Sequence, residues 1–131
     1  MTAFRTVTDT FCVSPQITTA DVAAAAAQGV SLIINNRPDG EAPDQTPGAA
    51  IAAAAEAAGL AYVHIPVAGR PGPAQVNAMR EAMAGASGKV LAYCRSGTRS
   101  ITTWAMGADA PRDRIVSLCA QAGYDVAGSL A

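Results

Sequence analysis

The stretch Lys89-Val-Leu-Ala-Tyr-Cys-Arg-Ser-Gly-Thr-Arg-Ser100 decides the fold. The run that ends at Tyr93 is short and continuous, which is typical of a strand covered by helices on both faces of a parallel sheet. A tight polar loop follows, and residues Arg99 to Met106 are predicted to form a helix. A buried strand, a loop and a helix in this order indicate an α/β fold.

Earlier parts of the chain repeat this organisation. Alanine-rich helical segments are predicted at 18–28, 47–58 and 73–86, and each ends near a glycine, which suits the position just after a helix. Short apolar runs follow at 30–35, 60–65 and 89–93. Thr46 is predicted to cap the second helix. Three such units predict an α/β fold, with a central, mostly parallel sheet of about four to five strands flanked by helices.

The remaining segments extend this plan. The run Thr10-Phe-Cys-Val13 predicts an additional edge strand. Apolar residues at helical spacing between Asp113 and Ala122 predict a helix. We expect a turn and a short helix over 123–128.

Length and composition limit the classes of function. The chain has 131 residues, so we predict one domain over 1–131. A net charge of −1 provides no basic surface, and we expect no nucleic-acid partner. Apolar runs end well before the ~18 residues of a membrane span, so no membrane partner is expected. No signal-peptide pattern occurs at Met1, and we expect a cytoplasmic protein.

Cysteine and histidine are scarce. Three cysteines (Cys12, Cys94 and Cys119) and one histidine (His64) occur, without a Cys-x-x-Cys motif. This pattern excludes a disulfide framework and a zinc ribbon. We therefore predict no metal and no cofactor. Cys12 and Cys119 are expected to be small, buried apolar residues.

The loop after Tyr93 has the properties of an anion site. Successive backbone N–H groups and a helix N-terminus attract negative charge. Arg95 and Arg99 add full positive charge, and Gly97 permits a tight turn. These surroundings favour a nucleophilic sulfur at Cys94, directed at an oxyanion of tetrahedral shape. The alternative is a buried structural cysteine before an ordinary helix.

At these residues the chain resembles two families. One comprises the cysteine-dependent protein tyrosine and dual-specificity phosphatases, whose loop is Cys, five residues, Arg, then Ser or Thr. The other comprises the rhodanese sulfurtransferases, which have a shorter loop. Four residues separate Cys94 from Arg99, so the loop alone is similar to that of a single-domain rhodanese.

The rest of the chain resembles the bacterial beta-lactamase-hydrolase-like family, whose members are similar to dual-specificity phosphatases in fold. The resemblance rests on four segments: Phe11-Cys-Val-Ser-Pro-Gln16, Ile33-Ile-Asn-Asn-Arg-Pro-Asp-Gly-Glu41, Tyr62-Val-His-Ile-Pro-Val67 and Ala122-Gly-Tyr-Asp125. It spans about residues 8 to 128. It implies a dual-specificity phosphatase-like fold with a shortened loop.

This resemblance implies a mechanism. Cys94 would attack phosphorus and form a cysteinyl-phosphate, and Arg99 would hold two equatorial oxygens. Ser100 would donate a hydrogen bond to the departing sulfur. The phosphate would lie on the backbone N–H groups of the loop Arg95, Ser96, Gly97, Thr98 and Arg99. The substrate would be a phosphorylated small molecule or phosphoprotein, with an aryl or phosphotyrosine-like ester.

Phosphatases of this kind use an acid to protonate the leaving oxygen, but the segment 66–73 has no Asp or Glu. Asp39 is one candidate acid, but its place in a Pro-Asp-Gly turn favours a structural role in that turn. Glu41 and Asp44, from the same polar loop, are expected to be solvated charges. His64, within an apolar strand, is expected to be a core residue.

Two arginines outside the Cys94 loop are also candidates for contacts with the substrate or with nearby carboxylates. Arg70, on the segment without an acid, could contact a second anionic group of the substrate or simply aid solubility. Arg37 is expected to pair with Asp39 or Glu41.

Two other functions stay open. A rhodanese-type sulfurtransferase would form a persulfide on Cys94, and the short loop supports it. A non-catalytic phosphate-binding domain would explain the missing acid, although the presence of Cys94 argues against it.

Overall fold

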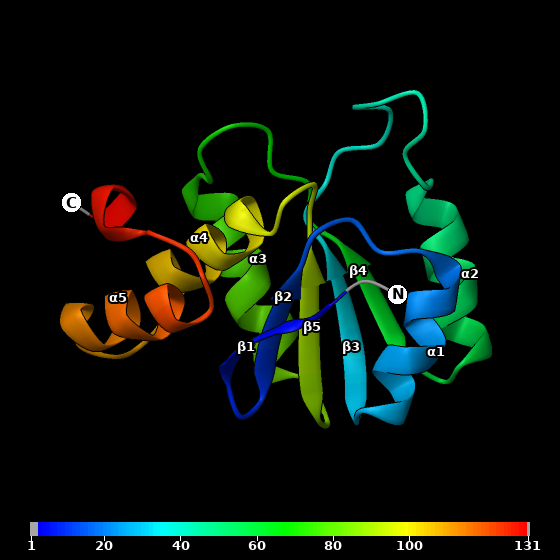
Figure 1. Cartoon of the computed structure of the whole chain (residues 1–131), viewed down its shortest axis with the longest axis horizontal. Helices are drawn as coiled ribbons and strands as arrows, with labels where there is room; N and C mark the ends of the chain where they lie inside the picture. Colours follow the sequence, from blue (N-terminus) through cyan, green and yellow to red (C-terminus); the bar gives the residue numbers. More distant parts are fainter. Residues whose placement is uncertain (1–2, 131) are drawn as a thin grey trace.

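The computed structural model describes residues 3–130 and has one five-stranded sheet (Figure 1). The strands lie in the order β1-β2-β5-β3-β4, and β1 is antiparallel to β2 while all other neighbours are parallel. This confirms the predicted α/β class and the mostly parallel sheet. The strands are β1 (Arg5–Thr8), β2 (Phe11–Ser14), β3 (Val30–Asn35), β4 (Ala61–His64) and β5 (Lys89–Tyr93).

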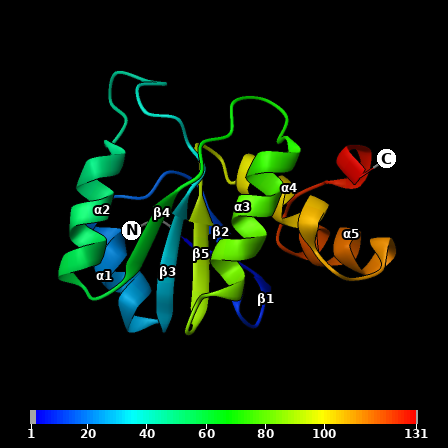
Figure 2. The ribbon, with the colours of Figure 1, turned by 180° about the vertical axis from the view of Figure 1, so that it is seen from behind.

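Helices cover both faces of the sheet (Figure 2). One face carries α1 (Thr19–Ala27) and α2 (Gly48–Ala57). The other carries α3 (Pro73–Ala84), α4 (Thr98–Gly107) and α5 (Arg112–Gln121), and a 3₁₀ turn, η1 (Ala127–Leu130), follows. Within residues 3–130, no helix is long and apolar enough to cross a membrane.

Strand β5 shows why the apolar runs are continuous. Val90 and Ala92 pack into the core beneath α3, α4 and α5, whereas Leu91 and Tyr93 pack into the core beneath α1 and α2. Successive side chains of a strand point to opposite faces. A strand covered on both faces therefore needs apolar residues at every position.

The prediction of an edge strand at Thr10–Val13 was wrong. The strand there, β2, lies between β1 and β5, and Phe11 stacks on Trp104 of α4 with ring centroids 5.3 Å apart. The edge is β1, which the sequence analysis did not predict. Its Arg-Thr-Val-Thr sequence is largely polar because only one of its residues, Val7, is buried.

The predicted cap of α2 was also wrong. Pro47 occupies the N-cap position in place of Thr46. The N–H of Gly48 instead donates to Asp39 Oδ1 at 2.9 Å, from the preceding loop. A carboxylate distant in sequence therefore satisfies the helix terminus that a local cap usually satisfies.

Candidate active site

The predicted loop lies where β5 ends, between the ends of β2 and β3. The N–H of Cys94 donates to the carbonyl of Ser14 at 3.4 Å, and the N–H of Asn36 donates to that of Tyr93 at 2.8 Å. The carboxyl ends of three parallel strands therefore meet at one edge of the sheet, the upper edge in Figure 1. Ligands of open α/β sheets bind at this kind of edge.

The loop directs a backbone donor at the sulfur. Cys94 is fully buried, and the N–H of Gly97 donates to its Sγ at 3.1 Å. Two carbonyls of the loop point away from the sulfur to outside partners. The carbonyl of Arg95 accepts a hydrogen bond from the N–H of Gln16 at 3.2 Å. The carbonyl of Ser96 accepts one from the hydroxyl of Tyr124 at 2.8 Å.

The position of Gly97 admits only glycine. Its φ is +95°, and an added Cβ would overlap the hydroxyl of Tyr124. Gly97 is also the N-cap residue of α4. The first N–H groups of a helix have no partners within the helix, so those of Arg99 and Ser100 are oriented as anion donors.

Arg99 is held by two acceptors. Its Nη1 donates to Glu41 Oε2 at 2.7 Å and to the carbonyl of Val67 at 2.8 Å, and its Nη2 donates to Glu41 Oε1 at 2.8 Å. A guanidinium has five N–H groups. Within the described residues, Nε–H and the second hydrogen of Nη2 are not used in these bonds. They form a side-on fork that can bind two oxygens of a phosphoryl group.

Glu41 joins two arginines. Its Oε1 also accepts the Nε–H of Arg37 at 3.0 Å, and Nη1 of Arg37 reaches Gln16 Oε1 at 3.0 Å. This confirms the predicted pairing of Arg37 with Glu41. The hydrogen bond from Arg99 is the chief cause that lowers the pKa of Glu41 to about 2. Glu41 is therefore ionised at neutral pH and cannot serve as a general acid in this arrangement.

The same ion pair acts on Arg99. Its hydrogen bond to Glu41 raises the pKa of Arg99, and the nearby sulfur of Cys94 adds to this effect. The guanidinium therefore lies within electrostatic reach of the sulfur.

Of the other acid candidates, Asp39 and Asp44 lie in the loop between β3 and α2, and His64 lies at the end of β4. Asp39 and Asp44 are exposed, and Asp39 holds the start of α2. His64 is exposed, and its Nε2 lies 2.9 Å from the carbonyl of Arg37. The prediction of a core histidine was wrong because β4 is an edge strand. Proton donation by Asp39 stays a prediction.

Ser100 and Arg95 differ in exposure. Ser100 is fully buried, and among residues 3–130 its hydroxyl has no hydrogen-bond partner. The predicted hydrogen bond to the departing sulfur of Cys94 stays a prediction. An unpaired buried hydroxyl beside the loop can still turn toward the sulfur when charge develops there. The side chain of Arg95 is exposed.

The other two cysteines are structural. Cys12 and Cys119 are buried, as predicted, and both are free thiols. Burial raises the pKa of each to about 11, so neither is a thiolate at neutral pH.

Three residues that support the loop were not predicted. Gln16 and Tyr124 hold its carbonyls, and Val67 orients Arg99. All three lie in segments that carried the family resemblance, which was the only signal that could have identified them.

Known proteins resemble this chain over most of its length. Residues 3–110 match the family described as beta-lactamase hydrolase-like protein, phosphatase-like domain. Beta-lactamase hydrolase-like proteins of Agrobacterium fabrum and Xylella fastidiosa are 44% identical over 67% of this chain and 36% identical over 92%. The chain spans only 21% and 29% of those two relatives.

Solved structures show the same fold. The structure of a candidate phosphatase from Neisseria meningitidis has a TM-score of 0.80 and 34% identity, covering 93% of this chain and 89% of that one. Tk-PTP in its active form has a TM-score of 0.72 at 16% identity, covering 97% and 89%. At 16% identity, the similarity to Tk-PTP shows the fold alone.

Proposed function

We propose that this chain, which belongs to the phosphatase-like domain family of the beta-lactamase hydrolase-like proteins, hydrolyses phosphomonoesters through a cysteinyl-phosphate on Cys94. One observation carries the proposal. The N–H of Gly97 donates to Cys94 Sγ at 3.1 Å, beside an arginine whose side-on fork is left open by its ion pair with Glu41. Donors fixed before the substrate arrives stabilise transition-state charge without reorganisation.

In the first step, Cys94 Sγ attacks phosphorus as a thiolate. The S–P bond forms while the P–O ester bond breaks, and the ester oxygen leaves with the electron pair of that bond. Arg99 Nε and Nη2 and the N–H groups of the loop bind the equatorial oxygens. Removing one such donor typically slows a reaction by about 10²–10³.

In the second step, water attacks phosphorus and the S–P bond breaks. Inorganic phosphate leaves, the thiolate of Cys94 is restored, and the proton of the water passes to solvent. The buried hydroxyl of Ser100, which has no partner, is suited to donate to the sulfur as its negative charge returns.

The leaving group determines the substrate class. The segment 66–73 contains no carboxyl group, and Glu41 is ionised. Alkyl esters need proton donation to the leaving oxygen, whereas aryl esters leave readily as phenolates. We therefore propose aryl or phosphotyrosine-like substrates, carried by a small molecule or a phosphoprotein.

Hydrolysis of p-nitrophenyl phosphate by wild type and Cys94→Ser, measured across pH, tests the proposal. We expect turnover by wild type and none by the variant. Equal rates for both proteins, or none for wild type, would contradict it.

The four-residue spacing between Cys94 and Arg99 favours one alternative, sulfur transfer through a persulfide. Transfer from thiosulfate to cyanide without ester hydrolysis, with a persulfide on Cys94 detected by mass spectrometry, would establish that function instead.

A further inference from the structure

A small cavity adjoins the candidate phosphate site. It has a volume of about 210 Å³ and lies between the β4–α3 loop, the first two turns of α4 and η1. Arg99 lines it, so the cavity begins where the phosphoryl site ends. Because sites for drug-sized ligands measure about 300–1,000 Å³, this volume suits one functional group of a substrate.

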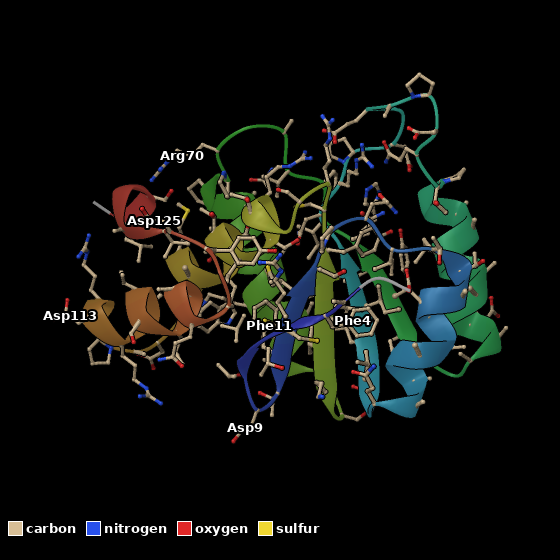
Figure 3. The ribbon with its side chains drawn as sticks, in the orientation of Figure 1. Phe4, Asp9, Phe11, Arg70, Asp113 and Asp125 are labelled. Atoms are coloured by element: carbon tan, nitrogen blue, oxygen red, sulfur yellow. The ribbon has the colours of Figure 1, made fainter. Side chains whose placement is uncertain are left out.

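Arg70 supplies the charge of this cavity. Its Nη2 donates to the carbonyl of Ser129 at 3.0 Å, so the guanidinium lies beside η1 (Figure 3). Among residues 3–130, ion pairs join Glu41 to Arg37 and Arg99, and no carboxylate pairs with Arg70. Within the described part of the chain, the guanidinium therefore brings to the cavity a positive charge that no carboxylate pairs with.

The other walls are compatible with an anion. Thr98 and Thr102 lie one turn apart on α4 and line the cavity, and their hydroxyls can donate hydrogen bonds. Asp125 is the acidic residue closest in sequence to a lining residue of this cavity, Ser129. It lines a different cavity with Tyr124, and its Oδ1 accepts the N–H of Ala127 at 3.1 Å.

We propose that this cavity, the Arg70 pocket, binds a second anionic group of the substrate, a carboxylate or a phosphate, while the phosphoryl group lies in the Cys94 loop. The inference rests on the proposed function and narrows its substrate class. The preferred substrates are phosphomonoesters that carry a second negative charge near the ester.

Matched esters test the pocket. The probes are meta- and para-carboxyphenyl phosphate, the neutral carbamoyl counterpart of each, and meta-phenylene bisphosphate. Dissociation constants are measured by calorimetry on Cys94→Ser, and kcat/KM on the protein with Cys94 intact. An ion pair of this exposure corresponds to a preference of about fivefold for the charged esters. A preference confined to the bisphosphate or to one carboxylate isomer supports the pocket and identifies its anion.

Arg70→Gln is expected to abolish that preference and to leave the neutral esters unchanged. Arg112→Gln is the matched control. Nη2 of Arg112 likewise donates to a carbonyl of η1, that of Ala127 at 2.9 Å, but Arg112 does not line the cavity. Its replacement should preserve the preference.

The two proposals fail in different ways. Absence of phosphate release from every ester by the intact protein contradicts the proposed phosphatase, while calorimetry still measures the preference. Equal affinity for charged and neutral esters, or a preference that survives Arg70→Gln, overturns the Arg70 pocket whether or not phosphate is released.

Discussion

Glu41 and Arg99 form a two-bond ion pair across the site, with Oε2 2.7 Å from Nη1 and Oε1 2.8 Å from Nη2. The carboxylate comes from the polar loop after β3, and the guanidinium comes from the first turn of α4. The ion pair thereby occupies one N–H of Nη1 and one of Nη2, and it leaves Nε–H and the second N–H of Nη2 open. Glu41 is therefore a positioning residue, which sets the direction in which Arg99 presents its remaining donors.

Glu41→Gln should lower kcat/KM for p-nitrophenyl phosphate by about tenfold or more, because a misplaced donor can cost up to about 10² in rate. We expect KM and the inhibition constant of inorganic phosphate to rise as well. Asp44→Asn, an exposed carboxyl of the same loop, is the control and should change neither. A faster Glu41→Gln enzyme would show that the carboxylate obstructs the phosphoryl site.

The same ion pair predicts an acid-sensitive stability. The pKa of Glu41 falls from an ordinary 4.5 to about 2 in the folded protein, so the unfolded chain binds the proton more tightly. The stabilisation is complete above pH about 4.5 and is lost as pH falls toward about 2. In urea unfolding, the difference between wild type and Glu41→Gln should therefore shrink as pH falls through that range. A difference independent of pH would contradict this origin.

Gly97→Ala should destabilise the fold by about 1–3 kcal/mol and abolish activity, because alanine at φ +95° is strained and its Cβ would displace Tyr124. Urea unfolding and p-nitrophenyl phosphate hydrolysis measure the two effects. Gly128→Ala is the control, since a Cβ there meets nothing within 4 Å. Matching unfolding midpoints for the two variants would disprove the steric argument.

Ser100→Ala should slow the second step more than the first, because the returning thiolate loses a donor. Cysteinyl-phosphate should then accumulate, and mass spectrometry after rapid acid quench would detect it. Stability should change little, since the hydroxyl has no partner to lose.

Thr103→Val is the contrasting variant for this test. In the wild type, the hydroxyl of Thr103 donates to the carbonyl of Arg99 at 2.7 Å. Loss of this hydrogen bond should cost about 1 kcal/mol of stability without trapping the cysteinyl-phosphate. If Ser100→Ala behaves in the same way, Ser100 has a structural role only.

The central strands could be predicted because burial on both faces makes a strand apolar at every position. Leu91 and Ile33 illustrate this, since both are fully buried between layers of helices. The edges lack that property. Only one of the four residues of β1 is buried, and His64 lies on the outer strand β4, so apolar runs alone could not place either correctly.

The site was predictable to the extent that it is local. Cys94, Gly97 and Arg99 lie in one loop between β5 and the first turn of α4, so their proximity could be predicted from the sequence alone. The partner of Arg99 is 58 residues away on an irregular loop, where no pattern distinguishes Glu41 from Asp44. Only the folded structure, in which Glu41 contacts Arg99, distinguishes the two carboxylates.

The two outward carbonyls of the loop also bear on how the protein folds. Gln16 follows the second strand and Tyr124 follows the last α-helix, so the loop is completed by residues from near both ends of the described chain. Contacts between distant segments form slowly, because long loops must close before the contacts contribute. We therefore expect that, during refolding, phosphate binding is recovered only when these contacts between distant segments have formed.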